Sequence, residues 1–127
     1  MKKLVFALAL FLLVSCDAFG PTLSKGVYFC STNYGTIYLE LLSGGNCLIR
    51  FDGCKEDSGT YRKDGDQITL IATATDWKES GKNRDWVTYR FSDHVGLITE
   101  INQFSIEADV VYGRQNKTAT CRFIKKK

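Results

Sequence analysis

Five cysteines are the residues of this chain with the most chemistry to offer. Cys16 directly follows an apolar segment, whereas Cys30, Cys47, Cys54 and Cys121 are spread over the rest of the sequence. An even number of cysteines in an exported chain is typical of disulfides, and four cysteines allow three pairings. The spacing of zinc ligands is missing and the chain has one histidine, so we expect no metal site and no cofactor.

His94 is the residue best suited to general acid–base chemistry, because a histidine changes its charge near neutral pH. It lies in Ser92-Asp93-His94-Val95-Gly96, which is typical of a turn, and we interpret it as an exposed structural residue. The chain has no Gly-x-Ser-x-Gly elbow and no glycine loop for phosphate. Asp64 and Asp66 flank a turn glycine and are interpreted as turn formers. The sequence therefore predicts a protein that is not an enzyme.

The segment Thr75–Asp85 is long for a connection between two strands. Trp77 and Trp86, the two tryptophans of the chain, lie at its ends, with Lys82 and Arg84 between them. Loops on a rigid sheet often bind partners, and Trp and Arg are enriched at interaction hot spots, so these four residues are the binding candidates. The simpler interpretation, which we favour, is a cross-strand tryptophan pair that packs on the sheet and closes the loop.

The elements that must position these residues are strands. Branched and aromatic residues alternate with polar ones after residue 25, and Gly44-Gly45 and Asp64-Gly65 mark turns. A sheet this long protects its edges best by closing, so we expect an all-β fold, an antiparallel meander of eight or nine strands in a closed or nearly closed small barrel. The predicted strands are Val27–Ser31, Thr36–Ser43, Cys47–Asp52, Gly59–Lys63, Gln67–Ala74, Trp86–Ser92, Leu97–Ile101, Phe104–Val111 and Thr118–Ile124.

This order of strands restricts the disulfides. In a simple meander Cys30 and Cys54 lie at one rim, Cys47 lies at the other, and Cys121 lies in the last strand, beside the first if the barrel closes. Cys47 and Cys54 are about 20 Å apart along an extended strand, too far for the roughly 4.4–6.8 Å between bridged Cα atoms. Either Cys47 stays unpaired or the topology differs. We favour a Cys30–Cys121 disulfide, which would tie the closing strands together.

The N-terminal segment is typical of an export signal. Lys2 and Lys3 precede the apolar run Leu4–Val14, which is shorter than the roughly 20 residues of a transmembrane helix. Leu13-Val14-Ser15-Cys16 resembles the lipobox of bacterial lipoproteins. The resemblance implies cleavage before Cys16 and acyl chains such as palmitate on that cysteine, which would anchor the chain stably in a membrane. The alternative, an ordinary signal peptide, fits poorly because Ser15-Cys16 is not an A-x-A site.

The resulting organisation is a signal peptide over residues 1–15, a lipidated tether over 16–25 and a barrel domain over 26–127. The expected location is the bacterial cell envelope, with the chain anchored by lipid. Asp17 resembles the inner-membrane retention signal of some enteric lipoproteins, a rule that other phyla do not follow, so the choice of membrane stays open.

Two further resemblances concern the barrel. The first is to small lipocalin-like lipoprotein domains such as the N-terminal domain of the copper-homeostasis outer-membrane lipoprotein, although the CxxC pair of that family is missing here. It rests on Gly26-Val27-Tyr28, Leu39, Leu41, Gly59-Thr60-Tyr61 and Gly65-Asp66-Gln67-Ile68-Thr69-Leu70.

The second resemblance is to C-type lysozyme inhibitor lipoproteins, which are also small barrels. It rests on Tyr28-Phe29-Cys30 and Cys121-Arg122. The inhibitory segment of that family has the form Ser-Gly-x-x-Tyr. Here Ser58-Gly59-Thr60-Tyr61 is one residue shorter and lies early in the chain.

Size and charge limit the partners. Without its signal peptide the chain has about 110 residues, enough for one domain with a real core, and its net charge falls from +3 to about +1. No basic stripe is interleaved with aromatic residues, so we expect no nucleic-acid partner. Lys125, Lys126 and Lys127 form a basic run that we expect to be solvated, with contact to anionic lipid as the alternative.

Three functions are compatible with this reading. The first is a monomeric, non-enzymatic binding module on a membrane, for an envelope protein or for a small apolar ligand held among the inward aromatics Tyr28, Tyr61, Tyr89 and Phe91. In so small a barrel such aromatics more often fill the interior. The second is a lysozyme inhibitor, and the third is a structural or stress-sensing lipoprotein without a ligand. An empty interior would favour a small ligand, and a cleft-inserting loop would favour the inhibitor.

Overall fold

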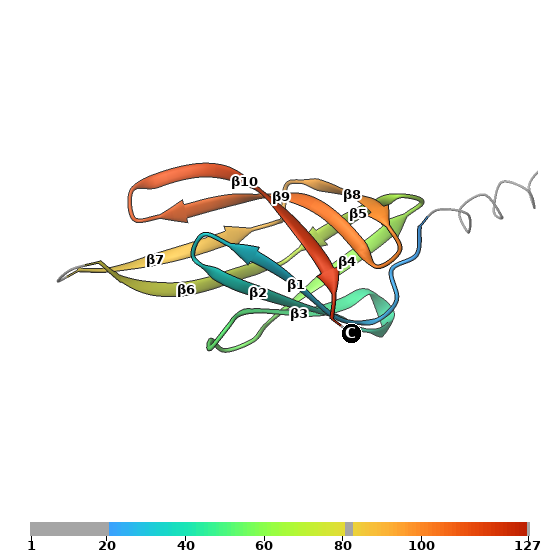
Figure 1. Ribbon diagram of the computed structural model, residues 1–127, viewed down its shortest axis with the longest axis horizontal. Helices are drawn as coiled ribbons and strands as arrows, with labels where there is room; N and C mark the ends of the chain where they lie inside the picture. The colour runs from blue at the N-terminus through green and yellow to red at the C-terminus, as the bar shows by residue number, and fades with distance from the viewer. Residues whose placement is uncertain (1–20, 81–82, 127) are drawn as a thin grey trace, which may run out of the picture.

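The computed structural model describes residues 21–80 and 83–126. They form ten β-strands and one short 3-10 helix, η2 (Ser43–Gly45) (Figure 1). The strands are β1 (Gly26–Thr32), β2 (Gly35–Leu41), β3 (Asn46–Phe51), β4 (Asp57–Asp64), β5 (Gln67–Ile71), β6 (Thr73–Ser80), β7 (Asn83–Arg90), β8 (Val95–Glu100), β9 (Gln103–Tyr112) and β10 (Gln115–Lys125). None of the helices in the described residues has the length and apolar character needed to span a membrane.

Eight of these strands close into an antiparallel barrel in the order β1-β2-β3-β4-β5-β8-β9-β10, because β10 pairs with both β9 and β1. The two extra strands, β6 and β7, form a hairpin that continues from β5 and leads into β8. β9 pairs with β8 along its first half and with β7 along its second half. The expectation of an all-β, closed antiparallel barrel is confirmed.

The expected loop over Thr75–Asp85 is wrong, because most of this segment lies in β6 and β7. Its charged residues are typical of a loop, but the register places them in complementary pairs. Lys78 lies opposite Asp85, and Glu79 lies opposite Arg84. Opposite charges in directly opposed positions favour a strand pair. The expected strand Gln67–Ala74 is also divided, since β5 ends at Ile71 and β6 begins at Thr73.

The barrel wall has two weak junctions. β1 and β10 share only two registered pairs, Tyr28 with Lys125 and Phe29 with Ile124. β6 lies against β3, yet no backbone ladder joins these two described strands. Side chains must therefore hold the wall together at both places.

The interior is packed with aromatic side chains, as period-two burial along the strands requires. The ring of Phe123 stacks on Phe104 with centroids 5.0 Å apart and meets the edge of Phe91 at 5.8 Å. Tyr28 packs on Phe104 at 5.9 Å, and Tyr89 meets Phe51 at 5.7 Å. All six rings are buried, so they fill the barrel from one end to the other.

The two ends of the barrel differ. The N-terminal segment, η2, the β8–β9 turn and the end of β10 lie at one end, which we call the tether end. The β6–β7 hairpin and the β9–β10 turn lie at the other, the distal end (Figure 1). The strands that close the barrel and the buried core of the described residues lie within Gly26–Lys125. We therefore expect residues 21–127 to fold into the barrel without the preceding segment.

Candidate functional site

The β6–β7 hairpin carries the binding candidates. Its register places the Cα atoms of Trp77 and Trp86 directly opposite each other, as the interpretation of a cross-strand pair requires. Trp86 is 61% exposed, next to the fully buried Val87. Lys82 and the side chains of residues 77–85 lie outside the described part of the structure. Sequence reasoning therefore chose an exposed element of the distal end, although it described that element as a loop.

Aromatic residues from the β1–β2 turn, β7 and β9 pack together near the base of the hairpin. Tyr34, in the β1–β2 turn, stacks on Tyr112 of β9 with ring centroids 4.9 Å apart and planes inclined by 16°. It also meets the edge of Tyr89 at 6.4 Å, and Nζ of Lys117 lies 5.5 Å from its ring centre. The β1–β2 turn thus contacts β9 beyond the end of the short β1–β10 ladder. Nothing in the sequence indicates this contact, because it joins the β1–β2 turn to residues of β7, β9 and β10, which are far away in the chain.

Asp76 holds the base of the hairpin against the barrel. It is the one buried charged residue in the described part of the chain, with 8% of its surface exposed. The thiol of Cys54, in the β3–β4 loop, donates a hydrogen bond of 3.0 Å to Oδ1 of Asp76. This bond crosses the junction where β3 and β6 lack a ladder. Sequence reasoning missed the pair, because only folding brings these residues together.

Cys30 and Cys121 lie side by side in the core, and both are thiols. The interaction between the two thiols lowers the pKa of Cys30 and raises that of Cys121, and burial also raises the pKa of Cys121. Both side chains are buried, just beyond the end of the β1–β10 ladder. Cys47 lies apart from them, on β3, and burial raises the pKa of its thiol to about 11. The structure thus places together the two cysteines that the strand order favours, without a disulfide between them.

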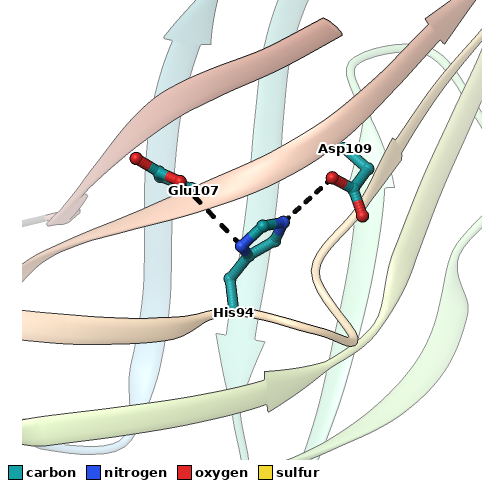
Figure 2. Close-up of polar contacts among 3 residues, drawn as sticks. All are labelled: His94, Glu107 and Asp109. Carbon is teal, nitrogen blue, oxygen red and sulfur yellow. Dashed lines mark hydrogen bonds and ion pairs between the residues drawn. The ribbon is translucent and has the colours of Figure 1, made fainter. Parts of the chain in front are cut away.

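His94 lies in a cluster with two carboxylates on the outer face of the barrel (Figure 2). Its Nε2 nitrogen is 2.9 Å from Oδ1 of Asp109, and its Nδ1 nitrogen is 3.9 Å from Oε2 of Glu107. An ionised carboxylate can only accept, so the imidazole donates to Asp109. The two acids are alternate residues of β9, whereas His94 precedes β8, so the cluster fastens the β7–β8 connection to β9.

The hydrogen bond with Asp109 raises the pKa of His94, and the charges of Asp109, Glu107 and Asp93 add to the effect. In the described part of the chain, the hydrogen bonds and ion pairs of His94 go to carboxylates and none goes to a serine, threonine or cysteine. This arrangement suits a histidine that fastens two strands. Asp64 and Asp66 remain at the β4–β5 turn, where Asp64 pairs with Arg62 at 3.2 Å.

The aromatics that could line a ligand pocket are occupied with one another or with backbone. Tyr28, Tyr89 and Phe91 belong to the packed interior, and the hydroxyl of the half-buried Tyr61 donates to the carbonyl of Leu42 at 2.8 Å. Four shallow depressions with fully described linings lie on the outer wall or at the tether end. Among their lining residues only Ala72 and Ile106 belong to the core.

The segment Ser58-Gly59-Thr60-Tyr61 lies within strand β4 and pairs with β3 and β5. It is therefore not the cleft-inserting loop that would favour a lysozyme inhibitor. Within residues 21–80 and 83–126, no group of three or more histidine, cysteine, aspartate or glutamate side chains is placed to hold a metal ion.

Comparison with known proteins gives no match, since no family model, no curated protein and no solved structure is significantly similar to this chain. The candidate site therefore rests on geometry. Its components are a tether end, a filled barrel and a distal end that carries the β6–β7 hairpin.

Proposed function

We propose that this protein is a lipid-anchored lipoprotein of the bacterial cell envelope. In this proposal it is a non-enzymatic, monomeric module that binds an envelope protein through the β6–β7 hairpin. Acyl chains on Cys16 hold it to the membrane, and the hairpin is the part that reaches the partner. A disulfide between Cys30 and Cys121 completes the mature protein after export.

The observation that carries this proposal is the placement of the two functional segments at opposite ends of the barrel. Residues 21–25 enter at the tether end, and the β6–β7 hairpin projects from the distal end (Figure 1). A chain anchored through Cys16 would therefore present the hairpin away from the membrane. The exposed indole of Trp86 supports a contact role, because large aromatic side chains dominate interaction hot spots.

The filled interior favours a protein partner over a small apolar ligand. Small-molecule sites are usually concave pockets of about 300–1,000 Å³ that enclose most of the ligand. Here the inward aromatics pack on one another at centroid distances of 5.0 to 5.9 Å. A protein surface can instead be engaged by an exposed strand pair without any cavity.

A photo-cross-linking amino acid at position 86, in living cells, tests the hairpin directly. We expect it to form a discrete adduct with an envelope protein. The matched control position is Val95 on β8, which is 62% exposed compared with 61% for Trp86. The same adducts from both positions, or no adduct from position 86, would contradict the proposal.

The double variant Trp77→Ala with Arg84→Ala separates binding from stability. If these residues bind the partner, the affinity falls by at least about 2 kcal/mol while the melting temperature stays close to that of the wild type. If they only close the hairpin, the affinity is unchanged and stability falls by roughly 0.2–1 kcal/mol, the contribution of a cross-strand aromatic pair. A thermal melt is therefore recorded beside the cross-linking yield.

A further inference from the structure

The N-terminal segment is fastened to the tether end through Asn102, in the β8–β9 turn. Its side-chain oxygen accepts hydrogen bonds from the backbone N–H of Ser24 at 2.8 Å and from the Ser24 hydroxyl at 2.9 Å. The backbone N–H of Asn102 donates to the carbonyl of Thr22 at 2.8 Å. Asn102 has a φ of 59°, a left-handed conformation that asparagine tolerates better than most residues. These bonds fix residues 22–24 on the barrel.

The end of β10 joins the same network and brings positive charge to it. Nζ of Lys125 donates to the hydroxyl oxygen of Ser24 at 2.6 Å, and its backbone N–H donates to the carbonyl of Asn102 at 3.1 Å. The backbone N–H of Lys126 donates to the carbonyl of Val27 at 2.7 Å. The basic run at the end of the sequence therefore begins beside the tether.

This face of the tether end is basic and partly apolar. An open groove of about 460 Å³ lies there, and its lining includes Lys125, Lys126 and the 69% exposed Ile101. Lys25 is exposed in the adjoining segment. Among the described residues, no carboxylate lies within 4 Å of the ammonium groups of these three lysines. Their charge is thus available to an external anion.

Glu40 on β2 lies opposite Val27, whose carbonyl accepts from the backbone N–H of Lys126, so one carboxylate stands one strand away from this surface. The other acidic residues of this end lie further along the rim. Asp64 is paired with Arg62, and Asp66 belongs to the β4–β5 turn. Glu100 ends β8, next to Ile101, and is the acidic residue closest in sequence to the groove. Repulsion from Glu100 reduces the attraction of the lysines for an anion, but Lys127 adds a further positive charge to the basic run.

The length of the tether limits how far this face can lie from a membrane that holds Cys16. From Cys16 to Pro21, at roughly 3.6 Å per residue, the chain spans at most about 18 Å. A lipid on Cys16 therefore keeps the tether end within about two Debye lengths of the bilayer surface at physiological ionic strength, where anionic headgroups still attract lysines.

We propose that the surface formed by Lys25, Ile101, Lys125 and Lys126 docks on anionic phospholipid headgroups. The lysines contact the phosphates and Ile101 enters the interfacial layer. This inference rests on the lipid anchor of the proposed function, and it adds a second membrane contact that sets the orientation of the barrel. The hairpin then points away from the bilayer.

Co-sedimentation with vesicles tests the surface without the lipid anchor. The fragment 21–127, which contains the complete barrel but not Cys16, is mixed with vesicles of phosphatidylcholine alone or of equal parts phosphatidylcholine and phosphatidylglycerol. We expect binding to the anionic vesicles only, and loss of that binding at high salt, because the attraction is electrostatic.

The double variant Lys125→Gln with Lys126→Gln should reduce this binding by about 30-fold, the effect of two lysines near an anionic surface. Its matched control is Lys55→Gln with Lys117→Gln, at the distal end. Each pair removes two charges and one lysine close to a tyrosine ring, since Lys126 lies 5.9 Å from Tyr38 and Lys117 lies 5.5 Å from Tyr34. Thermal melts of both variants confirm that the barrel is intact.

Equal binding to both kinds of vesicle, or an equal loss in the two double variants, would overturn the proposal. So would the absence of binding by the wild-type fragment. Because the fragment lacks Cys16, none of these results depends on lipidation. Replacing Cys16 in the whole precursor tests the anchor separately, so the two proposals can fail independently.

Discussion

Gly59 shows how tightly β4 packs where β5 passes into β6. A Cβ atom at this position would lie 2.5 Å from the carbonyl oxygen of Ile71, 2.8 Å from Cβ of Ala72 and 3.1 Å from Sγ of Cys47. The contacts with Ile71 and Ala72 are shorter than those that real Cβ atoms make. The contact with Ile71 is with a backbone atom, which cannot rotate away as a side chain can. Close packing is therefore sufficient to explain the glycine at position 59. Its presence does not require that Ser58-Gly59-Thr60-Tyr61 act as an inhibitory segment.

Gly59→Ala should lower the free energy of unfolding by about 1–3 kcal/mol, because overpacking forces the neighbouring backbone to move. Urea unfolding of the two proteins measures the change. Ser58→Ala, at the exposed neighbouring position, is the control and should leave stability within about 0.5 kcal/mol of the wild type. If Gly59→Ala is as stable as this control, β4 does not pack as closely against Ile71 and Ala72 as the structure shows.

His94 should titrate above the ordinary histidine pKa of about 6.5, because its hydrogen bond with Asp109 favours the charged imidazole. A raised folded-state pKa means that the stabilisation is complete below the ordinary value and is lost as the pH rises through the folded-state value. Asp109→Asn should move the pKa back toward its ordinary value, and Glu107→Gln should move it less. As the chain has one histidine, an NMR titration of untagged protein reports this group alone. An unchanged pKa in Asp109→Asn would show that the contact is absent in solution.

At the scale of elements, the weakest part of the barrel is the closing pair β1 and β10. Two registered residue pairs are a short ladder for strands of this length. The thiols of Cys30 and Cys121 meet just beyond it, and the Tyr34 stack covers the opening further out. A covalent bond at this point would replace the hydrogen bonds that the two strands do not make.

Oxidation of the reduced protein by glutathione disulfide should link Cys30 to Cys121. The two thiols lose two electrons and two protons to the oxidant, which leaves as two molecules of glutathione. The closed loop is long, so stability should rise by roughly 2–4 kcal/mol. Non-reducing peptide mapping identifies the link, and Cys47→Ser should not affect it. A bond from Cys121 to Cys47 or Cys54 would contradict the observed closure of the barrel.

At the scale of the whole molecule, the proposed function makes the barrel a spacer between a membrane and a binding element. Its interior is filled with buried side chains, and different elements form its two ends (Figure 1). The tether end is basic where residues 22–25 meet the end of β10, whereas the distal end is built from aromatic side chains and the exposed hairpin. A lipid on Cys16 and a partner at the hairpin would then not compete for space.

Cys16→Ala should abolish anchoring, since the acyl chains have no thiol to which they can attach. The precursor should either remain uncleaved before position 16 or leave the membrane fraction. Partitioning into detergent and the intact mass of the protein measure both outcomes. If the variant still partitions into detergent with an acylated mass, the lipobox interpretation is wrong.

The sequence alone determined the fold class and the inward face of most strands. Side chains alternate between the two faces of a strand, so a local pattern is enough to predict burial. Apolar residues alternate with polar ones in the sequence of β2 and β9, and the apolar members are all buried: Ile37, Leu39 and Leu41 on β2, and Phe104, Ile106, Ala108 and Val110 on β9. The sequence also placed Cys30 and Cys121 on neighbouring strands, because closure of a meander joins its first and last strands.

Only the tertiary structure decided which distant residues meet. The hairpin of β6 and β7 forms although its composition is typical of a loop. It is supported because β7 pairs with the second half of β9. The contacts of Asp76 with Cys54 and of His94 with Asp109 depend on the register of strands that are far apart in the chain. Register is set by closure of the whole barrel, which no local pattern contains. For the same physical reason, the meeting of the tether with the basic end of β10 could be found only in the folded molecule.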